Sequence, residues 1–226
     1  SRSDVALEVV FMSVKTDGVV AFFGTDGVKA SVYEDKITDF VPEELVGNYA
    51  LGYNLAVFLG KHIDPEVTAQ VSVIKGDVIA FSFGNTVIGG VLMNADMPNY
   101  SKLMSVDGMS SVTLDKNVLS MMIASLHNIV EDDKLNKSVF LSMEKGILKV
   151  LAPKKPTDFV DGLPINYPKT HKIRVNSEKF VTCLRLFKGT HDVVINFDEK
   201  DCESIMVLSS PVDTKVRGIL LPLSIS

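Results

Sequence analysis

The sequence predicts an α+β fold built from two tandem copies of one module. Short stretches rich in Val, Ile and Phe alternate with Gly- and Asp-containing turns along most of the 226 residues, a pattern typical of antiparallel strands. Three other stretches carry apolar residues at helical spacing. The order of these elements in the first half recurs in the second half, which indicates an internal repeat.

The composition is that of a folded globular protein. Hydrophobic residues make up 46% of the chain and charged residues 23%, which argues against disorder. The two cysteines, Cys183 and Cys202, lack metal-ligand spacing, so we expect reduced thiols in the cytoplasm. The net charge of -5 argues against a surface that is basic all over, but it permits a local basic lining.

The first half predicts six strands and one helix. Turns such as Thr16-Asp17-Gly18 and Thr25-Asp26-Gly27 separate the first strands. Leu55, Phe58 and Leu59 have helical spacing and predict a helix over 51–63. The strands are expected at 7–14, 19–23, 28–33, 67–74, 78–83 and 86–93.

The second half predicts seven strands and two helices after a linker at 101–109. Asp115 is a plausible N-cap for a helix over 116–128, and Asn176 or Ser177 for a helix that ends at 187. The boundary between modules is expected at the linker, giving domains 1–104 and 105–226. The strands are expected at 111–114, 139–143, 147–151, 173–175, 193–197, 204–208 and 215–221.

Two sequence matches at nearly one offset carry the repeat. Val-Phe-Met-Ser-Val at 10–14 matches Val-Phe-Leu-Ser-Met at 139–143, an offset of 129 (139 − 10). Gly-Val-Leu-Met at 90–93 matches Gly-Ile-Leu-Leu at 218–221, an offset of 128 (218 − 90). One apolar match of this length is common by chance, whereas two with the same element order between them indicate a duplication.

The repeat also predicts a missing part. At this offset Ser1 corresponds to position 130, so the strand and helix at 111–129 have no counterpart in the first module. We therefore expect the sequence to begin inside its first domain. The hairpin around Phe11 is then expected to lack both a strand neighbour and a covering helix.

Several segments resemble the bacterial β sliding clamps, the ring-shaped processivity factors of DNA replication. Phe23-Gly-Thr-Asp-Gly-Val-Lys-Ala30 resembles the family's A-T-D-G-h-R-L turn, and Met97-Pro-Asn-Tyr100 resembles its F-P-D-Y junction. The helix from Asn176 to Phe187 fits F-N-x-x-Y-L-x-x-x-L. The tail Ile219-Leu-Leu-Pro-Leu-Ser-Ile225 is similar to V-V-M-P-M-R-L. These matches follow the family's order over nearly the whole chain.

The resemblance implies a DNA-clamp fold, in which six modules close a ring around duplex DNA with helices inside and sheets outside. This chain would align with the middle and last modules of the bacterial form. It would be a homotrimer if it is a two-module clamp, or a homodimer if it is part of a three-module clamp. The implied partners are duplex DNA, a DNA polymerase and a clamp loader that bind through short peptide motifs, without a cofactor.

A clamp lining should be basic without reading sequence, because phosphate contacts position a duplex but do not specify bases. The alternative is that these side chains are simply solvated, and the helix over 116–128 is poor in base. The candidate DNA-channel residues are Lys61, His62, Lys116, Arg185 and Lys188.

The resemblance also implies a peptide pocket formed by the turn, the junction, the last helix and the tail. Its chemistry would be a concave apolar site with a few polar anchors. Several positions depart from the family, such as Lys179 in place of an aromatic residue and Ser224 in place of Arg. The pocket residues would be Thr25, Gly27, Val28, Lys29, Ala30, Pro98, Lys102, Leu103, Leu135, Asn176, Lys179, Ser204, Ile205, Ile219, Leu220, Leu221, Pro222, Leu223 and Ile225.

The tail has two interpretations, a final strand that completes the core or an apolar wall of the pocket. Ile219 to Leu221 match an ordinary closing strand of the repeat, and Pro222 must end that strand because proline has no amide hydrogen. We therefore expect 219–221 to be mainly structural and 222–225 to line the pocket.

Enzyme chemistry is not indicated. The four histidines, at positions 62, 127, 171 and 191, are scattered without metal-ligand spacing. Thr190-His191-Asp192 is explained by a turn, and no nucleophile lies in an elbow motif. The sequence therefore predicts no catalytic residue and no metal site. The alternative function is a two-module protein-interaction scaffold that does not close around DNA.

Overall fold

The computed structural model describes residues 8–64, 67–74, 76–130, 137–152 and 162–224. Its backbone contacts divide the chain into two compact units. The first unit comprises Ser1–Gly27 and Val32–Tyr100, and the second comprises Val28–Ser31 and Ser101–Ser226.

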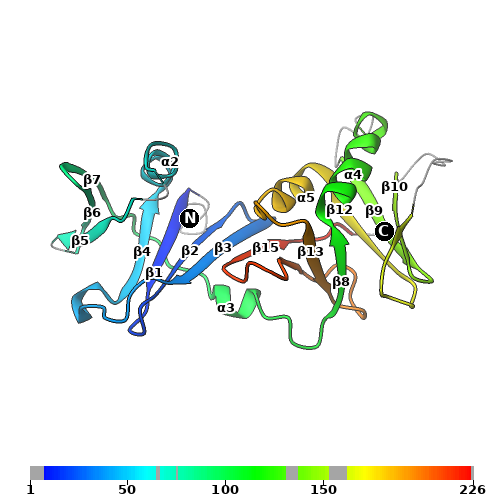
Figure 1. Ribbon diagram of the computed structural model, residues 1–226, viewed down its shortest axis with the longest axis horizontal. Helices are drawn as coiled ribbons and strands as arrows, with labels where there is room; N and C mark the ends of the chain where they lie inside the picture. The colour runs from blue at the N-terminus through cyan, green and yellow to red at the C-terminus, as the bar shows by residue number, and fades with distance from the viewer. Residues whose placement is uncertain (1–7, 65–66, 75, 131–136, 153–161, 225–226) are drawn as a thin grey trace. The chain divides into compact units, whose positions relative to one another are not determined.

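The first unit contains two antiparallel groups of strands and one longer helix (Figure 1). The strands of one group follow the order β4-β1-β2-β3, and those of the other β5-β6-β7. The elements are β1 (Val9–Val14), β2 (Val19–Thr25), β3 (Lys29–Lys36), the 3₁₀ turn η1 (Glu43–Leu45), β4 (Gly47–Gly52), α2 (Tyr53–His62), β5 (Gln70–Ile74), β6 (Val78–Phe83), β7 (Thr86–Val91) and the start of α3 (Tyr100–Leu103).

The second unit repeats this plan and adds a strand and a helix at its start. One group of strands has the order β12-β9-β10-β11 and the other β15-β14-β13-β8, while α4 and α5 pack against each other (Figure 1). The elements are β8 (Ser110–Asp115), α4 (Lys116–Val130), β9 (Ser138–Glu144), β10 (Ile147–Leu151), β11 (Leu163–Pro164), β12 (His171–Asn176), α5 (Ser177–Leu184), β13 (Asp192–Phe197), β14 (Met206–Ser209) and β15 (Val216–Leu220).

The two units have matching topology, as the predicted repeat requires. The order β4-β1-β2-β3 corresponds to β12-β9-β10-β11, and β5-β6-β7 to β13-β14-β15, with α2 and α5 in equivalent places. The glycines of the repeat show why this position is small. A Cβ on Gly90 would lie 2.9 Å from Leu55 Cδ2 of α2, and one on Gly218 would lie 3.2 Å from Leu186 Cδ1, just after α5. In each unit the helix therefore approaches the last strand over a glycine.

The described part of the first unit has no counterpart of β8 and α4, as expected, but the expectation that β1 lacks a strand neighbour is wrong. No element of the described residues 8–100 corresponds to β8 or α4. However, β1 has neighbours on both sides, since it pairs with β2 and with β4. Phe11 is accordingly 1% exposed, with its ring 6.4 Å from that of Phe23. Strand β4 was not among the predicted strands.

Other differences from the expected elements lie at their ends. Residues 51 and 52, predicted to be helical, close β4 instead. Helix α5 ends at Leu184 rather than at 187, because the amides of Leu186 and Phe187 bond to the carbonyls three residues earlier, as in a tightening last turn. The short strand β11 lies between the predicted strands at 147–151 and 173–175, where no strand was predicted.

Both predicted N-caps of the second unit are confirmed. Asp115 Oδ1 accepts hydrogen bonds from the amides of Asn117 (2.8 Å) and Val118 (2.9 Å). Asn176 Oδ1 accepts from the amide of Lys179 at 3.0 Å. These bonds satisfy amides that have no partner inside the helix, so each helix begins where the side-chain chemistry indicates.

Candidate peptide-binding surface of the second unit

The C-terminal tail links the two strand groups of the second unit. After β15, the amide of Leu221 donates to the carbonyl of Val28 at 2.8 Å, and the amide of Leu223 donates to the carbonyl of Arg174 at 2.7 Å. Pro222, which has no amide hydrogen, lies between them and is buried. The tail therefore leaves β15 at the proline, as predicted, and continues as a bridge to β12.

Alternate tail residues differ in burial. Ile219 and Leu220 are 5% and 0% exposed and belong to the core, whereas Leu221 is 41% exposed and Leu223 is half-buried. The division between structural and surface residues thus falls at 220–221, with Pro222 on the structural side. Leu221 and Leu223 present apolar surface from a backbone that is fixed by hydrogen bonds.

The last described residue of the tail, Ser224, is anchored by two polar contacts. Its carbonyl accepts from Arg174 Nη1 at 3.1 Å, and its hydroxyl donates to Glu203 Oε1 at 2.6 Å. Arg174 Nε also donates to Ser138 Oγ at 3.1 Å. Sequence reasoning missed Arg174 and Glu203, since no local motif marks them and only the folded tail brings them to Ser224.

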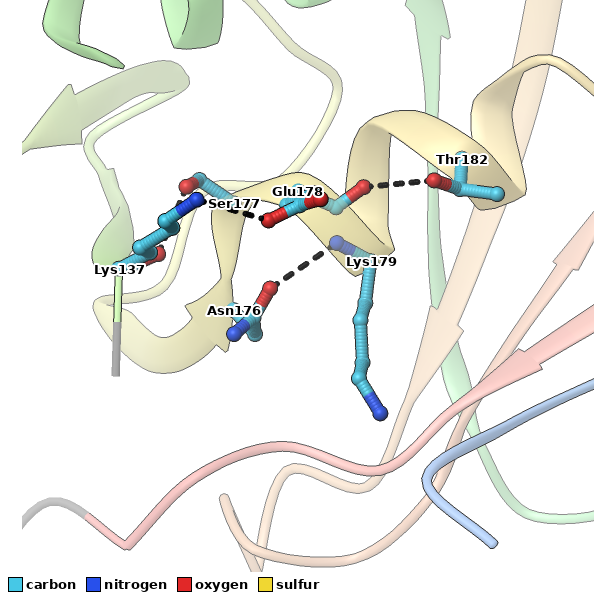
Figure 2. Close-up of polar contacts among 6 residues, drawn as sticks. All are labelled: Lys137, Asn176, Ser177, Glu178, Lys179 and Thr182. Carbon is cyan, nitrogen blue, oxygen red and sulfur yellow. Dashed lines mark hydrogen bonds and ion pairs between the residues drawn. The ribbon is translucent and has the colours of Figure 1, made fainter. Parts of the chain in front are cut away.

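The first turn of α5 is held rigidly beside β9 (Figure 2). The amide and the hydroxyl of Ser177 both donate to the carbonyl of Lys137, at 2.8 and 2.6 Å. Lys137 Nζ in turn pairs with Glu178 Oε2 at 3.1 Å. The side chain of Lys179 extends away from the helix (Figure 2) and is half-buried. Its backbone is held in the capped first turn of α5, because its amide donates to Asn176 Oδ1.

The remaining predicted pocket residues are distributed as follows. In the second unit, Val28, Lys29, Ser204 and Ile205 are half-buried, Ala30 is buried, and Lys102 and Leu103 are exposed. Thr25, Gly27 and Pro98 belong to the first unit. Leu135 and Ile225 lie outside the described residues.

The predicted turn at Thr25 is present in the first unit. Gly27 has φ of 84°, in the left-handed region that glycine adopts without strain. Its amide donates to Thr25 Oγ1 at 3.1 Å. The turn itself is therefore present, and the part of Thr25 and Gly27 in a pocket stays a prediction.

The candidate DNA-channel residues differ in availability. Lys61 and His62 at the end of α2, and Arg185 and Lys188 after α5, are exposed. Lys116 is half-buried, and its ammonium donates to the carbonyl of Phe187, so it also ties α4 to the end of α5. The exposed side chains of α4, Met121 among them, carry no positive charge within 116–126.

In the part of the chain that the structure describes, no three His, Cys, Asp or Glu side chains gather as a metal ion requires. Likewise, none of its helices combines the length and the apolar composition that a membrane span needs.

Comparisons with known proteins place the fold. No protein-family model and no curated protein sequence match the chain. Solved structures do match. The DnaN sliding clamp of Bartonella birtlesii, solved with griselimycin, gives a TM-score of 0.84 at 16% identity and covers 100% of this chain and 60% of its own.

Two further clamps agree. The β subunit of DNA polymerase III from Borrelia burgdorferi, solved with a natural product, gives 0.83 at 17% identity over 100% of this chain and 58% of its own. That of Thermotoga maritima gives 0.82 at 17% identity over 99% and 59%. The chain thus spans about three-fifths of the length of these proteins. Its two repeated α+β units have the sliding-clamp fold of the bacterial DNA polymerase III β subunit.

Proposed function

We propose that this chain is a sliding clamp, or part of one, which encircles duplex DNA and tethers a DNA polymerase. The observation that carries the proposal is the match of both units, in order and over at least 99% of the chain, to three bacterial clamps. In this function the protein acts in the cytoplasm. It catalyses no reaction and needs no cofactor, because a closed ring holds DNA topologically.

In this proposal, partner proteins dock short peptides on the tail surface of the second unit. Leu221 and Leu223 offer apolar contact from a hydrogen-bonded backbone, and Lys179 stands on a rigid helix turn. A preordered apolar site with a few polar groups loses little entropy when a peptide binds. The polymerase and the clamp loader would use the same surface.

Removing residues 223–226 tests the tail surface. Polymerase binding is expected to fall at least about tenfold, because an apolar anchor of the site is lost. The variant Val212→Ser is the control, since Val212 is 83% exposed in the same unit but lies outside the tail. Undiminished polymerase binding by the truncated chain, at unchanged assembly size, would return the tail to a packing role.

Ring closure requires contact between copies, and β7 offers an edge for it. Within the described residues, β7 is the last strand of its group, and Val87 and Val91 on it are 66% and 68% exposed. Its counterpart β15 has the segment Val28–Ser31 beside it in the second unit. We infer that β7 receives the equivalent strand of another copy, β11, in the same way.

Mass in solution separates the clamp from the alternative scaffold. A two-module ring predicts three chains per particle, and a three-module protein predicts two. The double variant Val87→Lys/Val91→Lys is expected to give single chains, because it buries charge in the contact, whereas Val212→Lys should leave the assembly intact. A wild-type protein that is monomeric at micromolar concentration would favour the scaffold.

A further inference from the structure

The outer face of the β12-β9-β10 strands in the second unit forms a compact basic surface. Strand registers place Ser142 of β9 between Lys149 of β10 and Lys172 of β12. In the next row, Phe140 lies between Leu151 and Arg174. Residues directly opposite each other in antiparallel strands project from the same face. We call these six residues the basic sheet face.

Burial confirms which side of the sheet this is. The residues that alternate with the basic sheet face, such as Leu141, Val150 and Ile173, are at most 2% exposed and form the core. Lys149 and Lys172 are exposed, and Arg174 is half-buried. With neighbouring strands about 4.8 Å apart, the two lysines are attached about 10 Å from each other, on either side of a small serine.

The three cations have no carboxylate partner among the described residues. Within the described part of the chain, Arg174 donates to two neutral oxygens, Ser138 Oγ and the carbonyl of Ser224. The ammonium of Lys172 lies 4.0 Å from the centre of the Phe140 ring. By contrast, Lys15, Lys36, Lys137 and Lys169 all form ion pairs with carboxylates. In a chain of net charge -5, this face is a local positive region.

The composition of the basic sheet face indicates which kind of anionic ligand it could bind. Phe140 and Leu151 are half-buried, so the basic sheet face combines apolar surface with positive charge. Single-stranded nucleic acid needs open aromatic faces for base stacking, and here Lys172 and Arg174 both lie over the Phe140 ring, at 4.0 and 5.9 Å. Carboxylates on an extended or helical segment need no such stacking platform.

We propose that the basic sheet face binds an acidic segment of a partner protein, with carboxylates over Lys149, Lys172 and Arg174 and an apolar side chain against Leu151. Charge complementarity of this kind increases the association rate and orients the partner. This inference does not depend on ring closure. Arg174 also donates to the carbonyl of Ser224, so the basic sheet face adjoins the tail surface.

The test uses the full chain and two fluorescent probes, a ten-residue peptide of alternating Glu and Leu and a ten-nucleotide oligo(dT). Fluorescence anisotropy measures binding, and amide NMR shifts locate it. We expect the peptide to shift residues of β9, β10 and β12, with affinity that falls as salt is added. The oligonucleotide should bind this face at least about tenfold more weakly, because Lys172 and Arg174 already lie over the Phe140 ring.

The variant Lys149→Glu/Lys172→Glu should weaken peptide binding at least about tenfold, since like charges then face each other. Its control is Lys200→Glu, a charge reversal at an exposed residue after β13. An amide NMR spectrum of the double variant whose dispersion matches that of the wild type would show that it is folded. Absence of peptide binding, equal binding by the double variant, or preferential binding of oligo(dT) at this face would each overturn the proposal.

Discussion

The two units share one topology but bury their helices very differently. Helix α5 of the second unit buries Phe180, Cys183 and Leu184, whereas α2 of the first unit has no buried residue. The second unit has α4 packed beside α5, and the described part of the first unit has no such helix. The comparison indicates that α4 completes the burial of α5, and that α2 is less buried because it has no such neighbour among the described residues.

The largest predicted effect compares an apolar side chain of α2, Leu59, with one that packs just after α5, Phe187. Phe187 is 2% exposed and Leu59 is half-buried. Phe187→Ala should cost the second unit about 3–5 kcal/mol in free energy of unfolding. Leu59→Ala should cost the first unit about 1 kcal/mol, since the half-buried Leu59 side chain removes less apolar area from water on folding than Phe187 does.

Denaturant titration with hydrogen exchange resolved by unit measures both changes. The double variant serves as an additivity control. Equal costs at the two positions would mean that α2 is as well packed as α5, and the comparison would fail.

Strand pairs, turns and helix caps could be predicted from the sequence because local chemistry specifies them. The strands Val78–Phe83 and Ile147–Leu151 have the predicted bounds, since strong turns flank them. Strand β4 could not be predicted, because Asn48 and two bounding glycines give it little intrinsic preference and its pairing with β1 stabilises it.

The candidate site was predictable only in part. Residues along one strand or turn, such as Asn176 or Leu221, can be recognised from the family's motifs. Arg174 and Glu203 could not, because they meet Ser224 through contacts between residues 21 and 50 positions apart. The ammonium of Lys116 also donates to the carbonyl of Phe187, just after α5, a contact that depends on how α4 and α5 pack.

A smaller effect is expected at the helix N-caps. Asn176 caps α5 through its side chain, whereas Gly52 at the equivalent place before α2 makes no side-chain cap. Asn176→Ala should cost about 1 kcal/mol of the second unit's stability. Gly52→Asn should stabilise the first unit by a few tenths of a kcal/mol. A loss of stability on Gly52→Asn would show that α2 begins differently from α5.

The smallest effect is a pH dependence confined to the second unit. Burial lowers the pKa of His171, partly opposed by Glu199 and Asp198, and its Nε2 has no hydrogen-bond partner among the described residues. The equivalent start of β4 is Gly47. Because the folded imidazole resists protonation, the unfolded chain binds more protons, and stability should fall as the pH drops through about 6.5.

His171→Phe should remove this dependence, since Phe keeps the ring that stacks on Phe197 at 4.9 Å. Unfolding at pH 7.5 and pH 5.5 measures it, with the exposed His191→Gln as control. The nearby Glu199 has a pKa of about 2, lowered by hydrogen bonds from Lys169 and Ser110. Its contribution to stability is lost progressively as the pH falls from about 4.5 towards 2, below the two pH values compared. An unchanged pH dependence in His171→Phe would assign the effect to another group.

Retention on DNA tests the central claim most directly. The protein is assembled on nicked circular duplex DNA, the complex is washed in high salt, and half of the sample is then linearised with a restriction enzyme. A clamp remains on the circle, because topology and not charge holds it, and it slides off the linear form. Equal retention on both forms, or loss from both at high salt, would contradict encirclement.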